Sequence, residues 1–146
     1  MNYLNCKSYA KLNSCLHVVN KRIDGYHNIE SIFYCIDFYD TLTFRKNNLK
    51  KICFDSNARD IDIKNNLVTK AFDIMCREYS NVSGLNVYLD KVIPIGSGLG
   101  GGSSNAAVTL ISINKIFNLN LSNDVLKNLA IQIGSDVPFF IEGGSS

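Results

Sequence analysis

A stretch rich in glycine and serine constrains this fold more than any other part of the sequence. Five glycines and three serines occupy eight of the nine positions from Gly96 to Ser104. An alternating apolar run, residues 85–89, precedes them, and apolar residues at helical spacing follow from Ala106 to Phe117. This order predicts a strand, a glycine loop and a helix. Backbone N–H groups and the positive end of the helix dipole favour a phosphate in such a loop.

The glycine stretch differs from two common nucleotide-binding motifs. No lysine follows the glycines, so the stretch is not the nucleotide loop of pattern Gly-x-x-x-x-Gly-Lys-Ser/Thr. Gly96, Gly98 and Gly101 satisfy the bare dinucleotide pattern, but strand–helix alternation is short and Leu121 stands where an acidic residue would follow. The alternative is a flexible linker. Periodic apolar segments on both sides favour anion or nucleotide binding.

Composition excludes several other classes of protein. The 146 residues are 46% hydrophobic and 19% charged, which is typical of one soluble globular domain. A net charge of +2 with scattered basic residues argues against a nucleic-acid partner. No apolar stretch reaches the roughly 18 residues of a membrane span, and no signal peptide is expected. Five widely spaced cysteines predict reduced thiols in a reducing compartment.

The order of the predicted elements, strands first and then helices mixed with strands, indicates an α+β fold. The predicted strands are residues 8–12, 16–19, 32–36, 41–44, 51–54 and 85–91, with a last strand beginning at 139–141. Turns are predicted at residues 21–25, 39–40 and 47–48, and Asn13-Ser14 separates the first two of these strands. One helix is predicted from residue 67 to 79, with an asparagine of the preceding Asn65-Asn66 pair as its N-cap, and another, opened by Ser122, from Asn123 to about Ile133.

Polar residues outside the glycine loop could supply phosphoryl-transfer chemistry. A bound phosphate needs a base for the attacking hydroxyl and a positive charge for the moving phosphoryl group. Asp136 and Lys11 are the residues of those types. A lysine beside an aspartate favours the ionised carboxylate, which can accept a hydroxyl proton. Tyr26 and His27, after a turn, could form a stacking wall for a base.

Each of these residues also has an ordinary structural interpretation. A lysine on a strand usually faces water or an exposed edge, so Lys11 alone indicates little. Asp136 precedes Pro138 by two positions, and aspartate is common in turns. Tyr26 and His27 could be half-buried packing residues, since a lone histidine is more often structural than functional.

Three motifs together resemble the GHMP kinases, the superfamily of galactokinase, homoserine kinase, mevalonate kinase and phosphomevalonate kinase. The glycine loop is similar to their motif Pro-x-x-x-Gly-Leu-Gly-Ser-Ser-Ala-Ala. Within the superfamily the chain is most similar to the 4-diphosphocytidyl-2-C-methyl-D-erythritol kinases, over roughly residues 8–144. The segments that carry this resemblance are Ala10-Lys11-Leu12-Asn13, Arg22-x-Asp24-Gly25-Tyr26-His27, Asp40-Thr41-Leu42, residues 93–107 and Gly134-Ser135-Asp136-Val137-Pro138-Phe139-Phe140.

The resemblance implies transfer of the ATP γ-phosphoryl group to the 2-hydroxyl of 4-diphosphocytidyl-2-C-methyl-D-erythritol, with Mg²⁺ carried mainly by the ATP phosphates. It makes Asp136 the catalytic base and Lys11 its partner. Asn13 would contact the methylerythritol end, Tyr26 would stack on the cytosine, and His27 would hydrogen-bond to it. The residues implied in ATP binding are Pro94, Ile95, Gly96, Ser97, Gly98, Leu99, Gly100, Gly101, Gly102, Ser103 and Ser104, with Asn66 and Lys91 near the adenine.

The resemblance also implies an architecture. Residues 1–146 would form the N-terminal, ATP-binding domain, of the ribosomal protein S5 domain 2-like type, truncated at its C-terminal edge. The family's second, ferredoxin-like domain would follow, so these residues alone are expected to bind substrate weakly and turn over poorly. Tyr9 departs from the family, which usually has proline there. The alternatives are another kinase of the superfamily or a non-catalytic nucleotide-binding fragment. The bacterial cytoplasm is the expected location, with a plastid-type organelle as the alternative.

Overall fold

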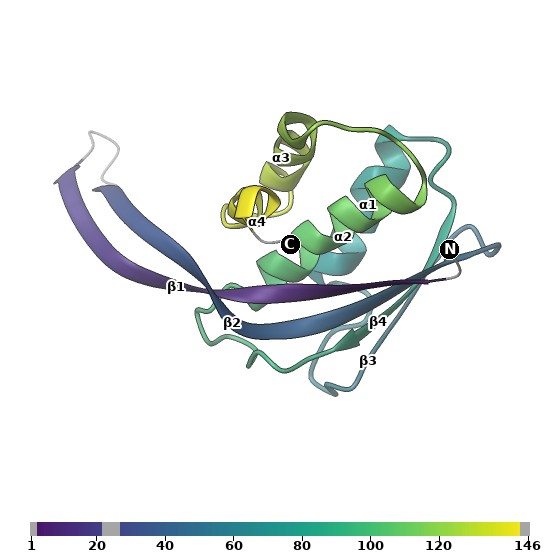
Figure 1. Ribbon diagram of the computed structural model, residues 1–146, viewed down its shortest axis with the longest axis horizontal. Helices are drawn as coiled ribbons and strands as arrows, with labels where there is room; N and C mark the ends of the chain where they lie inside the picture. The colour runs from purple at the N-terminus through teal and green to yellow at the C-terminus, as the bar shows by residue number, and fades with distance from the viewer. Residues whose placement is uncertain (1–2, 22–26, 144–146) are drawn as a thin grey trace.

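The computed structural model describes residues 3–21 and 27–143, and the side chains of residues 3–14 and 32–143. Its elements follow in the order β1 (Leu4–Lys21), β2 (His27–Asn47), β3 (Ile52–Ser56), α1 (Leu67–Glu78), β4 (Gly84–Asp90), α2 (Gly101–Ile116), α3 (Asn123–Ile131) and α4 (Val137–Gly143). The helices lie on one face of a four-stranded sheet (Figure 1). The predicted α+β class is therefore confirmed.

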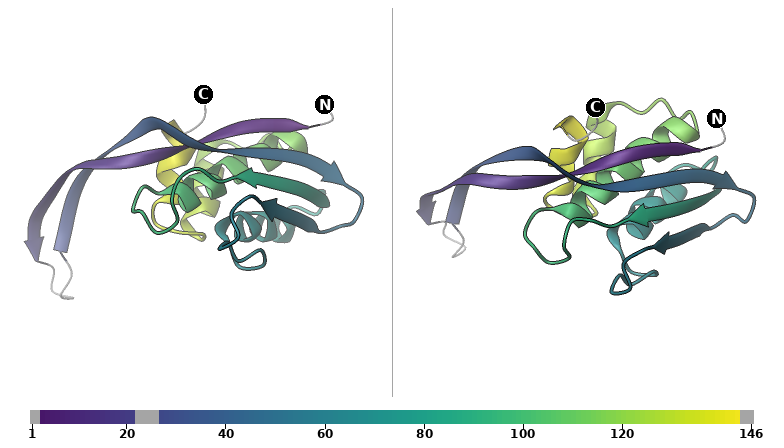
Figure 2. Two further views of the ribbon diagram at one scale, coloured as in Figure 1. Left: turned by 90° about the horizontal axis from the view of Figure 1, so that it is seen from below. Right: turned by 60° about the horizontal axis from the view of Figure 1, so that its bottom comes forward.

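The sheet has the strand order β1-β2-β4-β3. β1 pairs with β2 and β2 pairs with β4 in antiparallel fashion, whereas β3 and β4 are parallel. Parallel neighbours need a crossover, and α1 supplies it between β3 and β4. β4 lies between β2 and β3 in the sheet. The chain enters the glycine loop from the C-terminal end of β4 (Figure 2).

β1 and β2 form one long antiparallel ribbon whose far half projects from the body as an arm (Figure 1, Figure 2). The predicted turn at residues 39–40 is wrong, because β2 runs through it. The two predicted strands at residues 8–12 and 16–19 are parts of the single strand β1, which continues through residues 13–14. Register shifts between Tyr9 and Ala10 and between Asn13 and Cys15 absorb the irregular pattern without ending the strand. The predicted turn at residues 21–25 begins at Lys21, which still belongs to β1, and its other residues lie outside the described part of the chain.

Two helices have the predicted caps. Asn66 Oδ1 accepts hydrogen bonds from the backbone N–H groups of Val68 and Thr69, at 2.9 and 3.0 Å, and so fixes the start of α1. Ser122 Oγ accepts one from Val125 N–H at 3.4 Å at the start of α3. These contacts confirm the two predicted N-terminal boundaries.

The last element differs from its prediction. Residues 139–141 belong to the helix α4, not to a strand. A short apolar run cannot by itself separate a strand from a buried helix. Pro138 sits in the first turn of α4, where its missing N–H costs nothing, and Phe140 and Ile141 are buried in the core.

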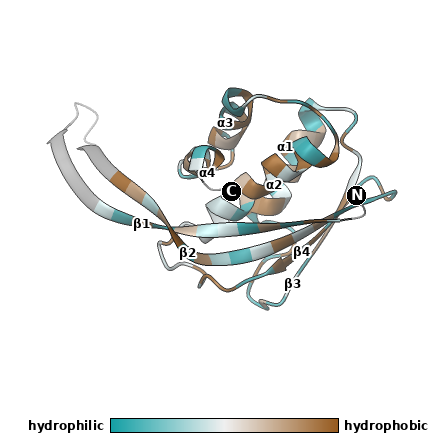
Figure 3. Cartoon of the chain, viewed as in Figure 1, coloured by the Kyte–Doolittle hydropathy of each residue, from teal (hydrophilic) through white to brown (hydrophobic). Residues whose placement is uncertain are grey.

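α2 runs through the middle of the hydrophobic core. Its residues Ala106, Leu110 and Ile113 are fully buried, as are Phe44 and Leu85 of the sheet. Hydrophobic residues gather where α1, α2 and the sheet meet (Figure 3). Each fully buried side chain of this size contributes about 1.5–3 kcal/mol to folding. This packing holds α2 in place and therefore fixes where its N-terminus lies.

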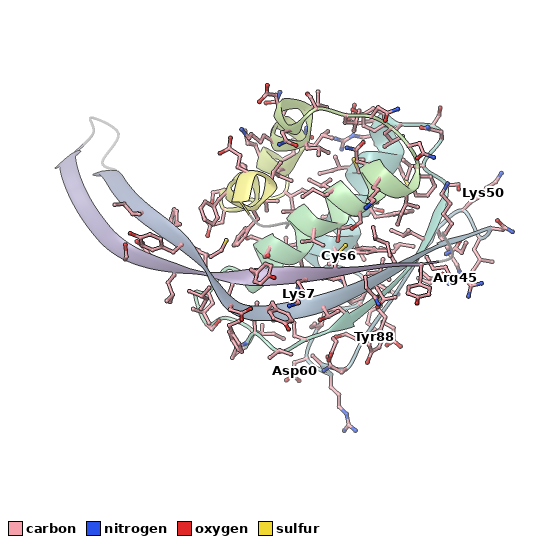
Figure 4. All side chains as sticks on the ribbon, in the orientation of Figure 1. Cys6, Lys7, Arg45, Lys50, Asp60 and Tyr88 are labelled. Carbon is pink, nitrogen blue, oxygen red and sulfur yellow. The ribbon has the colours of Figure 1, made fainter. Side chains whose placement is uncertain are left out.

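The two faces of the sheet have different environments. Cys6 points toward the helices, with its Sγ 3.5 Å from Ser112 Oγ on α2, while its neighbour Lys7 points to the open face (Figure 4). There the Lys7 ammonium lies 4.2 Å from the centre of the Tyr39 ring, and Tyr88 is 45% exposed. No helix in the described part of the chain is long and apolar enough to cross a membrane.

Candidate active site

The glycine loop leaves β4 and turns into the N-terminus of α2. Gly96, Gly98 and Gly100 have φ values of 73°, 76° and 70°, a region that residues with a Cβ rarely adopt. Gly100 is the N-cap of α2, and no side chain among the described residues caps that helix end. The first backbone N–H groups of α2 are thus directed at the loop, which is the arrangement that binds anions.

A cavity of about 420 Å³ lies beside the loop. Its lining includes eleven of the thirteen residues predicted for ATP, namely Pro94, Ile95, Gly96, Ser97, Gly98, Gly100, Gly101, Gly102, Ser103, Asn66 and Lys91. Leu99 and Ser104 do not line it. The Leu99 carbonyl accepts a hydrogen bond from Lys11 N–H at 2.8 Å, and the buried Ser104 hydroxyl accepts one from Ser8 Oγ at 2.8 Å. These two residues join the loop to β1.

Part of the cavity wall was missed from the sequence. Residues 60–62 and 65 line it together with Phe54 and Leu89 (Asp60 is labelled in Figure 4). Asp62 Oδ1 accepts hydrogen bonds from the backbone N–H groups of Lys64 and Asn65, at 2.8 and 3.2 Å, which shapes this segment. The bond from Lys64 is the main cause that lowers the pKa of Asp62. The sequence of this polar loop indicated turns but not that its residues line a cavity.

The two predicted catalytic residues meet. Lys11 Nζ lies 3.1 Å from Asp136 Oδ2, although the residues come from β1 and from the turn before α4. The Lys11 side chain is 10% exposed and that of Asp136 is 42% exposed. Because Lys11 N–H also bonds to the Leu99 carbonyl, the ion pair stands next to the glycine loop.

Gly100 is needed for this close approach. A methyl group at Gly100 would lie 2.9 Å from Lys11 Cγ and 3.0 Å from Phe140 Cζ. Both distances are shorter than ordinary carbon–carbon contacts. The absence of a side chain at Gly100 therefore lets the stem of Lys11 pass directly against the loop.

An aromatic cluster supports the lysine, and it was not predicted. The Lys11 ammonium lies 4.0 Å from the centre of the Phe33 ring, within the range of a cation–π interaction. The Phe33 and Phe139 ring centres are 5.4 Å apart, and those of Phe139 and Phe140 are 5.0 Å apart. Aromatic rings at these distances pack against one another and form an apolar wall beside the lysine.

The predicted substrate residues lie further along the ribbon. Asn13 is two positions beyond Lys11 on β1 and pairs with Phe33 in the register, so both belong to the same stretch of ribbon as Lys11. His27 begins β2 opposite Lys21, and its side chain lies outside the described residues, as does all of Tyr26. Ten strand positions, or about 33 Å of ribbon, separate Lys21 from Lys11. The described backbone does not bring His27 beside the ion pair.

No group of three or more His, Cys, Asp or Glu side chains could hold a metal ion among the described residues. Mg²⁺ typically binds through substrate phosphates, waters and one or two carboxylates. Asp136 is a carboxylate next to the glycine loop that could take part in holding such an ion.

Comparison with protein families gives a match over residues 66–144, to the family described as GHMP kinases N terminal domain. This segment contains α1, β4, the glycine loop and the helices that follow.

Curated relatives match almost the whole chain. A 4-diphosphocytidyl-2-C-methyl-D-erythritol kinase of Thermoanaerobacter sp. (strain X514) is 41% identical over 99% of this chain and 50% of the relative. One of Prochlorococcus marinus (strain MIT 9312) is 46% identical over 97% of this chain and 46% of the relative. The chain thus spans about half the length of the curated relatives it matches.

Solved structures agree with this family. The crystal structure of a 4-(cytidine 5′-diphospho)-2C-methyl-D-erythritol kinase matches with a TM-score of 0.81 and 30% identity, over 96% of this chain and 49% of that one. A homoserine kinase from Cytophaga hutchinsonii matches with a TM-score of 0.69 and 17% identity, over 99% of this chain and 44% of that one, which shows the shared fold alone. The chain belongs to the GHMP kinase family, whose N-terminal domain it carries.

Proposed function

We propose that this chain is the ATP-binding half of a kinase that phosphorylates the 2-hydroxyl of 4-diphosphocytidyl-2-C-methyl-D-erythritol, a step of non-mevalonate isoprenoid biosynthesis. One observation carries the proposal: the Lys11–Asp136 ion pair stands at 3.1 Å directly beside a glycine loop that suits phosphates. Relatives that are 41% and 46% identical carry the name of this activity. Their match extends over both the loop and the ion pair.

The proposed reaction uses Asp136 as a general base. The acceptor hydroxyl gives its proton to the Asp136 carboxylate while its oxygen forms a bond to the γ-phosphorus. The bond from that phosphorus to the β-phosphate oxygen breaks, and ADP leaves. With 42% of its side chain exposed, Asp136 is open to an incoming hydroxyl while Lys11 holds its other side. A positioned base of this kind typically contributes about 10²–10⁴-fold in rate.

The rest of the site would stabilise charge. Backbone N–H groups of the loop and the N-terminus of α2 would hold the phosphate oxygens, and Lys11 would balance the charge that moves to the acceptor. Mg²⁺ bound to ATP would neutralise phosphate charge during transfer. Asn66, at the N-terminus of α1, lines the cavity together with the apolar residues Phe54 and Leu89, and the adenine would lie on this side of it.

The acceptor side is assigned by resemblance. Asn13 would contact the methylerythritol end, and Tyr26 and His27 would hold the cytosine by stacking and hydrogen bonds. The ribbon that carries Asn13 and the backbone of His27 curves toward the helix-bearing side of the sheet (Figure 1). The four cysteines with described side chains (Cys6, Cys35, Cys53 and Cys76) are free thiols, which suits the proposed bacterial cytoplasm.

An acceptor panel tests the proposed function. ADP release by the full gene product that contains residues 1–146 would be measured with ATP, Mg²⁺ and one acceptor at a time. We expect release with 4-diphosphocytidyl-2-C-methyl-D-erythritol and only background with homoserine, mevalonate or galactose. Release with one of those acceptors instead would favour another kinase of the family. Background with all four would favour a non-catalytic nucleotide-binding protein.

A further inference from the structure

Asp40 is a carboxylate with no solvent exposure in the middle of β2. Its Oδ1 accepts hydrogen bonds from the backbone N–H groups of Val92 and Ile93, at 2.7 and 2.8 Å. Its Oδ2 lies 3.0 Å from Lys91 Nζ and accepts a hydrogen bond from Asn105 Nδ2 at 3.1 Å. Four separate donors therefore satisfy one buried charge, as a buried carboxylate requires.

These donors lie at both ends of the glycine loop. Lys91, Val92 and Ile93 lead from the end of β4 into the loop, and Asn105 is in the second turn of α2, where the chain leaves it. One side chain from a different strand therefore fixes the entrance and the exit together. Holding both ends leaves the loop less conformational freedom to lose when a ligand binds.

Lys91 is held in this cluster as well. Its side chain is 8% exposed, and besides Asp40 its ammonium donates to the Ile93 carbonyl. A methyl group at Gly101, the first residue of α2, would lie 3.3 Å from Lys91 Nζ. A cation this close to the positive end of a helix needs a neutralising partner, and Asp40 provides it.

The Asp40 carboxylate also determines the orientation of the Asn105 amide. Asn105 is 2% exposed, and its Oδ1 is the one buried side-chain oxygen or nitrogen without a partner within the described residues. Turning the amide over would place Oδ1 against the Asp40 carboxylate, where two acceptors repel. The contact with Asp40 thus determines how Asn105 stands, although it leaves a buried carbonyl unpaired.

We infer that Asp40 is a positioning residue for the glycine loop: through Lys91, Asn105 and the backbone of residues 92–93 it holds the loop in the shape that receives a nucleotide. This inference rests on the proposed function. Lys91 and Asn105 line the cavity beside the loop, whereas Asp40 does not. Asp40 therefore acts on the affinity for the nucleotide and leaves the affinity for the acceptor alone.

Binding measurements on the full gene product that contains residues 1–146 test the inference. Calorimetric titrations with Mg²⁺·ADP, and separately with the acceptor, would compare the wild type, Asp40→Asn and the control Asp37→Asn. Asp37 lies three positions away on the same strand and is exposed. We expect Asp40→Asn to raise the dissociation constant for ADP at least about tenfold, since misplacing a binding loop is costly. The acceptor constant should stay within about twofold, and Asp37→Asn should match the wild type.

A second variant covers the possibility that Asp40→Asn does not fold, which thermal unfolding would reveal. Asn105→Ala keeps the Asp40–Lys91 pair and removes one tie to the loop, so we expect ADP affinity to fall about fivefold. Folded variants that bind ADP like the wild type, or that lose ADP and acceptor affinity equally, would overturn the inference. If the wild type itself binds no ADP, the proposed function fails and the inference fails with it.

Discussion

Lys11 and Asp136 form an ion pair at 3.1 Å in which the lysine is nearly buried and the aspartate is open to solvent. This asymmetry gives each residue a different part in the proposed reaction. Phe33 and the glycine loop surround the Lys11 side chain, so its charge stays at a fixed point. The exposed carboxylate can reach a substrate hydroxyl while the ammonium holds its orientation.

Removing the Lys11 charge should slow the chemical step. In Lys11→Met the stem of the side chain remains, but Asp136 loses its partner and the moving phosphoryl group loses a positive charge. We expect kcat to fall by about 100-fold or more. Lys7→Met is the matched control, since Lys7 lies four positions away on the same strand, on the open face. Steady-state ADP release measures both, and equal rates in the two variants would argue against a role for Lys11.

Removing the Phe33 ring beside Lys11 should lower kcat less than removing the Lys11 charge. Phe33→Leu keeps an apolar side chain but removes the ring 4.0 Å from the ammonium. A cation–π interaction contributes about 0.5–2 kcal/mol, so we expect kcat to fall about 2- to 30-fold. Tyr39→Leu removes the ring beside Lys7 in the same way and should leave kcat unchanged. The prediction fails if kcat in Phe33→Leu equals that in Tyr39→Leu.

Alanine variants of Gly98 and Gly100 distinguish the effect of backbone strain from the effect of a steric clash. Gly98 and Gly100 both have positive φ, but only a methyl group at Gly100 would meet Lys11 and Phe140, since nothing lies within 4 Å of one at Gly98. Both alanine variants carry the strain of a left-handed backbone, about 1–2 kcal/mol. We therefore expect Gly100→Ala to lower kcat clearly more than Gly98→Ala. Comparable kcat values in two variants of similar thermal stability would contradict this account.

The turn at Asp62 predicts a defined pH dependence. The Lys64 backbone N–H, first among several donors, lowers the pKa of Asp62 below its ordinary 3.8. A lowered pKa contributes stability that is present above the ordinary value and is lost as pH falls through the folded value. We expect the free energy of unfolding of the wild type to exceed that of Asp62→Asn by a constant amount above about pH 5. The difference should shrink below pH 3.8, and denaturant titrations at pH 3 and pH 7 would measure it.

Local sequence patterns were sufficient for the parts of the fold that local forces determine. The apolar spacing of residues 67–79 and the capping residue Asn66 predicted α1, because a helix and its cap are built from neighbours in the chain. The glycine loop was predictable for the same reason. The break placed at residues 39–40 was wrong because polar Asp40 has its partners at residues 91–93 and 105, which local sequence does not reveal.

The meeting of Lys11 and Asp136 was expected from residue chemistry and from family resemblance, and the structure brings the two together. Phe33 gave no signal, because an apolar residue in a strand is ordinarily read as core. Residues 139–141 were misassigned for a related reason: three apolar residues fit a strand or a helix, and packing against α2 and α3 decides between them. The roles proposed for Asn13, Tyr26 and His27 stay predictions.

The most direct measurement on the proposed kinase site is a comparison of chemistry with nucleotide binding in Asp136→Asn, using the full gene product that contains residues 1–146. The amide keeps the shape of the side chain but cannot accept the hydroxyl proton. We expect kcat for ADP release to fall by about 10²–10⁴-fold, while the dissociation constant for Mg²⁺·ADP stays within about twofold. Near-normal turnover in this variant would contradict the assignment of Asp136 as the base.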